Sequence, residues 1–185
     1  MVVGVTGASG APIAERVLRA LQAAQVPVAL VVSNGGRTVI REECGVDADQ
    51  WASLATSFYR DDELGAPIAS GSRRGRGMAI VPCSSNTVAK VALGLADTLI
   101  TRAAHVQLKE RRPLVLVPRE TPLPAILLRH LTGLAEAGAS IVVAAPAYYT
   151  HPTSVQEMTD FVAGRVLDQL AVPHQLYRGW KEPPG

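Results

Sequence analysis

The sequence predicts an α/β fold in which a parallel sheet is covered by helices on both faces. Short apolar runs alternate along the chain with longer segments in which apolar residues recur at helical spacing. This alternation is typical of strands joined by crossover helices that pack on the two faces of a parallel sheet. Neither an internal repeat nor a linker interrupts the pattern, so we expect a single domain over residues 1–185.

Five runs are expected to be buried strands, because each is short, apolar and free of charged residues. They cover residues 2–6, 26–33, 78–82, 114–118 and 140–145. Helices are expected over residues 11–24, from residue 38 to at least 43, and over residues 85–95, 97–110, 124–137 and 155–170. Residues 45–77 carry mixed signals, and we expect the stretch rich in Ser, Gly and Arg at 70–77 to be a mobile loop. The proline-rich tail, residues 172–185, is predicted to be irregular.

The composition limits the classes of function. With 48% hydrophobic and only 18% charged residues, we expect the fold to bury further apolar surface between subunits. A formal net charge of +2 does not favour nucleic-acid binding. No apolar run reaches the ~18–20 residues that span a bilayer, and the start of the chain lacks the basic segment of a signal peptide. Cys44 and Cys83 match no disulfide or zinc spacing, so a cytoplasmic protein without a metal is expected.

The loops that follow the strands are the expected ligand site, because parallel sheets bind ligands at the carboxyl ends of their strands. The first loop, Gly7-Ala8-Ser9-Gly10, joins a buried strand directly to a helix. Its glycines allow the backbone to approach an anion, and the helix N-terminus offers free N–H groups. We therefore expect it to hold the phosphate of a nucleotide-type cofactor. The alternative is a tight turn that only packs strand against helix.

Two common nucleotide sites are not supported by the sequence. Ser33-Asn34, and not an acidic residue, closes the second strand, and no Tyr-x-x-x-Lys pair occurs, which argues against a nicotinamide enzyme. The lysine of a Walker motif is also missing, which excludes a P-loop kinase.

The later loops carry residues suited to binding and catalysis. The polar run 84–87 can form a second cradle for an anion or amide, although helix capping would need only one of its hydroxyls. Arg119 can grip a phosphate and Glu120 can move a proton, the alternative being a salt bridge between them. Tyr148 and Tyr149 offer hydroxyls and ring faces in the fifth loop. A cationic cluster is completed by three further residues, Arg102, Lys109 and Arg165.

Taken together, these loops resemble the UbiX-type flavin prenyltransferases. The resemblance covers nearly the whole chain, and it rests on the runs TGASGA, PCSSNT, LKERRPLVLVPRETPL, GASIVVAAPAYYTHP and RVLDQL. It implies a Rossmann-like or flavodoxin-like subunit, a homododecamer, and reduced FMN as the acceptor of a dimethylallyl group from dimethylallyl monophosphate. The product, prenylated FMN with new bonds at N5 and C6, would be passed to a UbiD-type decarboxylase.

The resemblance also implies roles for individual residues. The expected FMN contacts are Gly7, Ala8, Ser9, Ser33, Ser84, Ser85, Asn86, Thr87 and Arg119. The expected substrate contacts are Arg102, Lys109, Arg119, Tyr149, Arg165 and Trp180. Glu43 and Glu120 would form the acidic pair at the reacting centre, with Ser9 beside them, and the tail 172–185 would close over the site.

Two other functions remain open at this point. A flavin-dependent cysteine decarboxylase shares the Asn-Thr pair at 86–87, but it uses a histidine soon after the second helix, and here no histidine precedes His105. A non-catalytic flavin-binding protein would not need Lys109, Arg119, Glu120 and Arg165 together.

Overall fold

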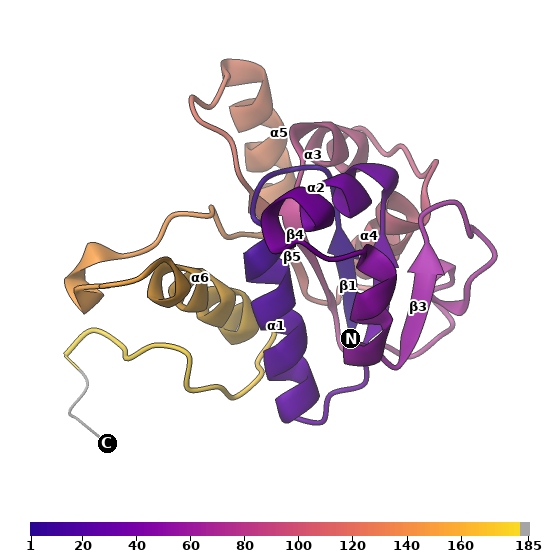
Figure 1. Cartoon of the computed structure of the whole chain (residues 1–185). Coiled ribbons are helices and arrows are strands. Elements are labelled where there is room, and N and C mark those ends of the chain that lie inside the picture. Colours follow the sequence, from indigo (N-terminus) through magenta and orange to yellow (C-terminus); the bar gives the residue numbers. More distant parts are fainter. Residues whose placement is uncertain (182–185) are drawn as a thin grey trace.

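The computed structural model describes residues 1–181, and in this part of the chain six parallel strands form one sheet (Figure 1). The strands are β1 (Val2–Val5), β2 (Ala29–Val32), β3 (Ser57–Arg60), β4 (Met78–Cys83), β5 (Leu114–Pro118) and β6 (Ser140–Ile141). Their order across the sheet is β3-β2-β1-β4-β5-β6, and every neighbouring pair is parallel. This is the strand order of Rossmann-type sheets, and it confirms the predicted fold class.

Helices cover both faces of the sheet and so complete three layers. They are α1 (Ala11–Ala23), α2 (Asn34–Cys44), α3 (Ser85–Ala92), α4 (Leu99–Lys109), α5 (Ala125–Glu136) and α6 (Val155–Gln169). One core cluster packs α1, α2 and α6 against the sheet, and the other packs α3, α4 and α5. In Figure 1, α6 projects beyond the sheet, and the C-terminal segment returns alongside it.

Successive side chains along each strand point to opposite faces of the sheet and so contribute to both hydrophobic cores. In β1, Val3 and Val5 belong to the α1 side, whereas Val2 belongs to the α4 side. The same switch occurs in β5, where Leu114 and Leu116 face one layer and Val115 and Val117 face the other. Each fully buried side chain of this size contributes about 1.5–3 kcal/mol, which explains why these strands are apolar throughout.

The structure differs from the sequence prediction at two strands. β3, with the sequence SFYR, was missed because it is a half-exposed edge strand rather than an apolar run. The predicted strand over residues 140–145 is paired in register only at Ser140–Ile141. Beyond that point the backbone bends, although Val142 N and Ala144 N still donate to carbonyls of β5.

Helix α2 begins at Asn34 instead of residue 38, because Gly35 and Gly36 form its first turn. Ser33 caps this turn by accepting a hydrogen bond from Gly36 N. A Cβ atom at Gly36 would lie 2.4 Å from Val5 O, and one at Gly35 would lie 2.9 Å from Gly7 Cα. The two glycines therefore let α2 pack directly against the end of β1.

This close approach yields a stability prediction. Gly36→Ala should lower the free energy of unfolding by about 2–3 kcal/mol, because the new methyl meets rigid backbone. Gly133→Ala is the matched control, since no atom lies within 4 Å of a Cβ there, and it should raise stability by about 0.5–1 kcal/mol. Urea unfolding followed by circular dichroism measures both values. Equal stability of Gly36→Ala and the wild type would contradict the packing argument.

Candidate active site at the carboxyl edge of the sheet

The two central loops of the carboxyl edge are joined through Thr6, which the sequence analysis did not single out. Its buried hydroxyl donates to Pro82 O at 2.8 Å and accepts from Ser84 N at 2.7 Å. These bonds connect the ends of β1 and β4, where the direction of strand order reverses. In Rossmann-type sheets the ligand crevice lies at this reversal point.

The first loop is anchored by a carboxylate of its own chain. Glu43 Oε2 accepts hydrogen bonds from Gly10 N and Ala11 N, each at 2.8 Å. The prediction that these N–H groups at the start of α1 are free for a cofactor phosphate is therefore wrong. Ser9, by contrast, is exposed, and its hydroxyl has no hydrogen-bond partner within residues 1–181. The part of the loop open to a ligand is therefore Gly7 and Ser9, since Ala8 between them is buried.

The predicted hydroxyl contacts have local roles. Ser33 caps α2, and Ser84 caps α3 by accepting from Thr87 N at 3.3 Å. The hydroxyls of Ser84 and Thr87 also lie 2.9 Å apart. A serine hydroxyl has one donor and two acceptor positions, so capping does not exhaust its capacity to bind a ligand. Asn86 is exposed, with no side-chain partner in the described part of the chain.

The third and fourth loops are joined through Glu120. Its Oε2 accepts a hydrogen bond from Ser85 Oγ at 3.1 Å. Arg119 is exposed, and among residues 1–181 it has no ion pair with Glu120 or any other carboxylate. The alternative of an internal salt bridge is therefore not supported, and the guanidinium remains available to an anion.

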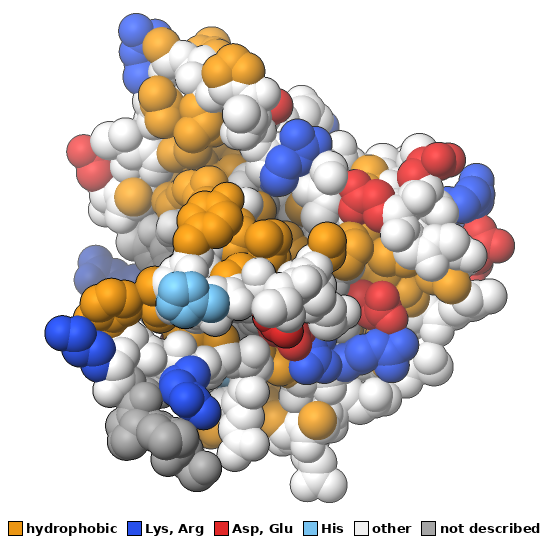
Figure 2. Space-filling model, turned by 60° about the vertical axis from the view of Figure 1, so that its left-hand side comes forward, with side chains coloured by type: hydrophobic (Ala, Val, Ile, Leu, Met, Phe, Trp, Pro, Cys, Tyr) orange, Lys and Arg blue, Asp and Glu red, His pale blue; other side chains and the backbone are white. Residues whose placement is uncertain are grey.

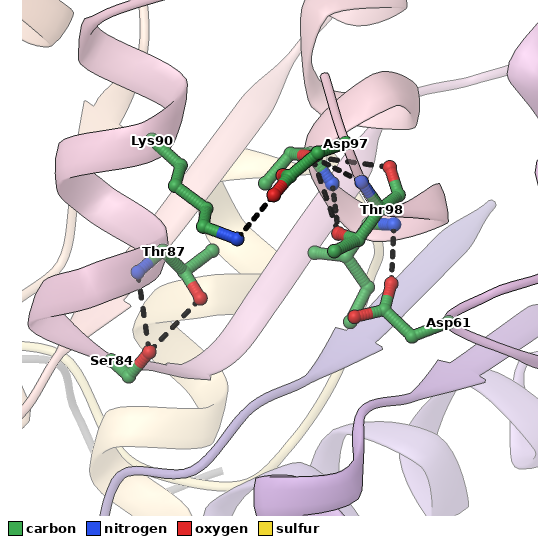
Figure 3. Close-up of polar contacts among 8 residues, drawn as sticks. Asp61, Ser84, Thr87, Lys90, Asp97 and Thr98 are labelled. Carbon is green, nitrogen blue, oxygen red and sulfur yellow. Dashed lines mark hydrogen bonds and ion pairs between the residues drawn. The ribbon is translucent and has the colours of Figure 1, made fainter. Parts of the chain in front are cut away.

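A polar network beside the third loop holds α3, α4 and the end of β3 together (Figure 3). Asp61, which follows β3, accepts from Ile100 N at 2.8 Å in the first turn of α4. Lys90 of α3 pairs with Asp97 at 2.6 Å, and Thr98 caps α4. Burial is the main reason that the pKa of Asp61 is raised, although its hydrogen bonds oppose this.

One chain does not assemble the predicted cationic cluster. Arg102 and Lys109 lie two turns apart on α4, and both are exposed. Lys109 ends the helix before β5 begins, whereas Arg119 follows β5. The five residues of that strand place the two ends about 16 Å apart at ~3.3 Å per residue. Arg165 lies on α6, which packs on the opposite face of the sheet.

Arg165 belongs to a compact polar group that connects α6 to the C-terminal segment. Its Nη1 donates to Asp168 Oδ2 at 2.7 Å and to Tyr177 OH at 3.0 Å. Tyr177 OH and His174 Nε2 also contact the Asp168 carboxylate. Burial alone would raise the pKa of Asp168, but the hydrogen bonds from Tyr177 and His174 and the nearby positive charge lower it overall. The hydrogen bond with Tyr177 is the main reason that the pKa of Arg165 is raised.

Tyr149 and Trp180 form an aromatic corner next to this group. Their rings meet edge to face with centroids 4.9 Å apart, and Tyr149 packs against Phe161 at 6.1 Å. They line an open cavity of about 570 Å³ together with Tyr177 and His151. The described part of the tail thus folds against the Tyr149 loop, while residues 182–185 lie outside the described residues.

The remaining expectations concern cysteines, metals and membranes. Cys83 is buried in the core, and burial raises the pKa of its thiol. Burial, with Glu15 and Glu43 nearby, raises the pKa of Cys44 to about 11. Within residues 1–181 no three His, Cys, Asp or Glu side chains are grouped as metal ligands. In the same range no helix has the length and apolar character needed to cross a membrane.

Comparison with known proteins identifies relatives that match almost the whole chain. The Flavoprotein family model matches residues 1–167. The flavin prenyltransferase UbiX of Deinococcus radiodurans is 48% identical, over 98% of this chain and 93% of its own length. The UbiX of Thermoplasma acidophilum is 46% identical, over 97% and 99%.

Solved structures agree with these relatives. The crystal structure of AnUbiX (PadA1) in complex with FMN and dimethylallyl pyrophosphate has a TM-score of 0.96 at 39% identity, covering 99% of this chain and 97% of that one. A dodecameric FMN-dependent UbiX-like decarboxylase from Escherichia coli O157:H7 has a TM-score of 0.95 at 42% identity, with 98% of both chains covered. The cysteine decarboxylase SpaF, at 22% identity and a TM-score of 0.60 over 77% of this chain and 82% of its own, shares the fold alone. The chain therefore belongs to the Flavoprotein family and, within it, to the UbiX-type flavin prenyltransferases.

Proposed function

We propose that this protein joins the dimethylallyl group of dimethylallyl monophosphate to N5 and C6 of reduced FMN. The prenylated FMN would serve a UbiD-type decarboxylase. The observation that carries the proposal is the carboxyl edge, where Thr6 holds the first and third loops together and Arg119 and Glu120 emerge beside them. The full-length similarity to a structure that contains FMN and dimethylallyl pyrophosphate supports it.

The residues at this edge suit FMN. The two loops that Thr6 connects carry two exposed hydrogen-bonding groups, Ser9 Oγ and the Asn86 side-chain amide. Neither group has a hydrogen-bond partner among the described residues. We assign the ribityl chain and phosphate to these loops, with Ser33, Ser84 and Thr87 giving secondary contacts. Gly7 lets the first loop pack closely against the first turn of α2, because a Cβ there would lie 3.1 Å from Gly35 Cα. Arg119 would contact both the flavin and the allylic phosphate.

The substrate phosphate would be held by residues from more than one subunit. Arg102 and Lys109 share an exposed face of α4, and Arg165 with Tyr149 lies on the far side of the sheet. These residues lie far apart within a single chain. In a homo-oligomer, neighbouring chains would place their copies of these residues beside Arg119. The dodecameric relative supports such an assembly.

The surface of the chain also favours assembly. Figure 2 shows apolar side chains running as a band from the region of α5 toward the C-terminal segment. Large apolar residues are exposed on α5 and after α3, namely Leu93, Leu95, Ile126 and Leu128. Apolar surface of this extent is typical of subunit interfaces.

The residue types suit the proposed chemistry. The C–O bond of the allylic phosphate breaks, and cationic and hydroxyl donors stabilise the charge that the phosphate gains. Tyr149 and Trp180 offer ring faces to the positive charge that develops on the allyl group. When the second bond forms, the double bond of the transferred group opens and takes up a proton while C6 loses one, and Glu120 would relay these protons. Glu43 holds the first loop through Oε2, and Oε1 has no hydrogen-bond partner in residues 1–181.

The activity can be tested by mass. Anaerobic incubation with reduced FMN and dimethylallyl monophosphate should yield a flavin heavier by one prenyl unit. Glu120→Gln should bind FMN normally but slow turnover by about 10²–10⁴-fold, because the proton relay is lost. Glu42→Gln, on the exposed face of α2, is the control and should behave like the wild type. Unchanged FMN with both mono- and diphosphate donors would overturn the proposal.

The shared site can be tested by mixing variants. Lys109→Ala and Arg119→Ala should each be inactive alone. If the two residues reach one phosphate from different subunits, co-assembled chains should regain about a quarter of wild-type activity, since that fraction of sites combines two intact residues. Separately purified oligomers mixed without reassembly are the control. Activity that stays at the level of the single variants after co-assembly would show that both residues act from one chain.

Asp168 should act as a positioning residue for Arg165. Asp168→Asn is expected to raise the KM for dimethylallyl phosphate about 5–10-fold with little change in kcat, because Arg165 loses its charged partner. Since folding lowers the pKa of Asp168, its contribution to stability exists above the ordinary value near 3.9 and disappears as pH falls through the lowered value. The melting-temperature gap between wild type and variant should therefore close in acid. A gap independent of pH, with an unchanged KM, would refute this role.

A further inference from the structure

A second cavity lies at the amino-terminal edge of the sheet, opposite the loops of the proposed active site. Its volume is about 240 Å³, and its lining includes Val2, Ala29 and Ser57, the first residues of β1, β2 and β3. The loop over residues 70–77, for which the proposed function has no use, forms one wall together with Gln107 and Arg112 of the α4 side. The volume is several times the ~30 Å³ that a water molecule occupies in the liquid.

The charge around this cavity is positive. Arg73, Arg74, Arg76 and Arg112 all contribute to the lining, which contains no acidic side chain. The first three are exposed, and none of them has an ion pair within residues 1–181. Glu110 is the nearby carboxylate, and it forms ion pairs with Lys109 at 2.8 Å and with Arg112 at 3.8 Å. The three guanidinium groups without an ion pair repel one another, and an anion between them would relieve this repulsion.

The loop over residues 70–77 is fixed to the rest of the structure by hydrogen bonds and close packing. Arg112 donates to Gly71 O at 2.9 Å and to Arg73 O at 3.0 Å. At the far end, Gly77 turns with a φ of 130°, and a Cβ there would meet Pro113 O at 2.9 Å. The loop is thus attached at both ends, and binding an anion would require little further ordering.

Gln107 adds a requirement that charge alone does not explain. Gln107 is among the residues that line the cavity, and it is only 3% exposed. Nε2 donates to Ala103 O at 3.1 Å, whereas Oε1 has no hydrogen-bond partner among the described residues. An unpaired buried acceptor costs about 1–3 kcal/mol, so the cavity favours a ligand that carries a hydrogen-bond donor.

We propose that this cavity binds inorganic phosphate as the hydrogenphosphate ion. Its charged oxygens match the guanidinium groups, and its O–H can donate to Gln107 Oε1. Sulfate has a similar size and charge but carries no proton at neutral pH, so it would leave Gln107 unpaired. The dianion of methyl phosphate lacks the proton as well. The same ion leaves the allyl group in the proposed reaction, but the assignment of this site rests on its own residues.

Isothermal titration calorimetry at pH 8 tests the site with sodium phosphate, sodium sulfate and methyl phosphate. The intact protein should bind phosphate at least 10-fold more tightly than the other two anions. The double variant Arg73→Gln/Arg76→Gln should lose at least 10-fold in phosphate affinity. The matched double variant Arg19→Gln/Arg129→Gln, with the same charge change on α1 and α5, should bind like the wild type.

Two further variants separate the elements of the proposal. Gln107→Leu should stay folded and bind phosphate no better than sulfate, because the acceptor that distinguishes them is gone. Arg165→Gln, which alters the proposed active site, should leave this binding unchanged and so separates the two sites. Equal binding of phosphate and sulfate by the wild type, or phosphate affinity that survives loss of Arg73 and Arg76, would overturn the proposal. Neither outcome depends on whether the protein prenylates a flavin.

Discussion

The buried hydroxyl of Thr6 is the interaction on which the carboxyl edge depends. It donates to Pro82 O and accepts from Ser84 N, so one side chain sets the separation between the loops after β1 and β4. Glu43 then pins the start of α1, and Ser85 joins the third loop to Glu120. Each of these bonds joins segments far apart in the sequence, and together they hold the loops of the proposed ligand site in fixed positions.

Much of the fold follows from local patterns. The apolar runs of β1, β4 and β5 predict buried strands because both faces of the sheet are covered, and helical spacing predicts α1 and α6 nearly to the residue. β3 could not be predicted in this way, because an edge strand can be half polar. α2 starts early because tertiary contact, and not propensity, decides the role of two glycines.

The candidate site was only partly predictable for a related reason. Residue type and position after a strand single out Ser9, Arg119 and Glu120, and the structure places all three at one edge. The bond from Glu43 to the start of α1 could not be foreseen, because it joins segments about thirty residues apart through tertiary packing. The separation of Lys109 from Arg119 is likewise a property of the folded sheet. We therefore propose that the expected cationic cluster forms in the assembly and not within a single chain.

The proposed shared site can be tested by a structure of the assembled protein with reduced FMN and dimethylallyl monophosphate. We expect flavin between the Thr6 and Ser84 loops, with the allylic phosphate beside Arg119. Lys109 and Arg165 of neighbouring subunits should then reach that phosphate at hydrogen-bond distances of about 2.7–3.2 Å. A phosphate held by one chain alone, with Lys109 facing solvent in the assembly, would contradict it.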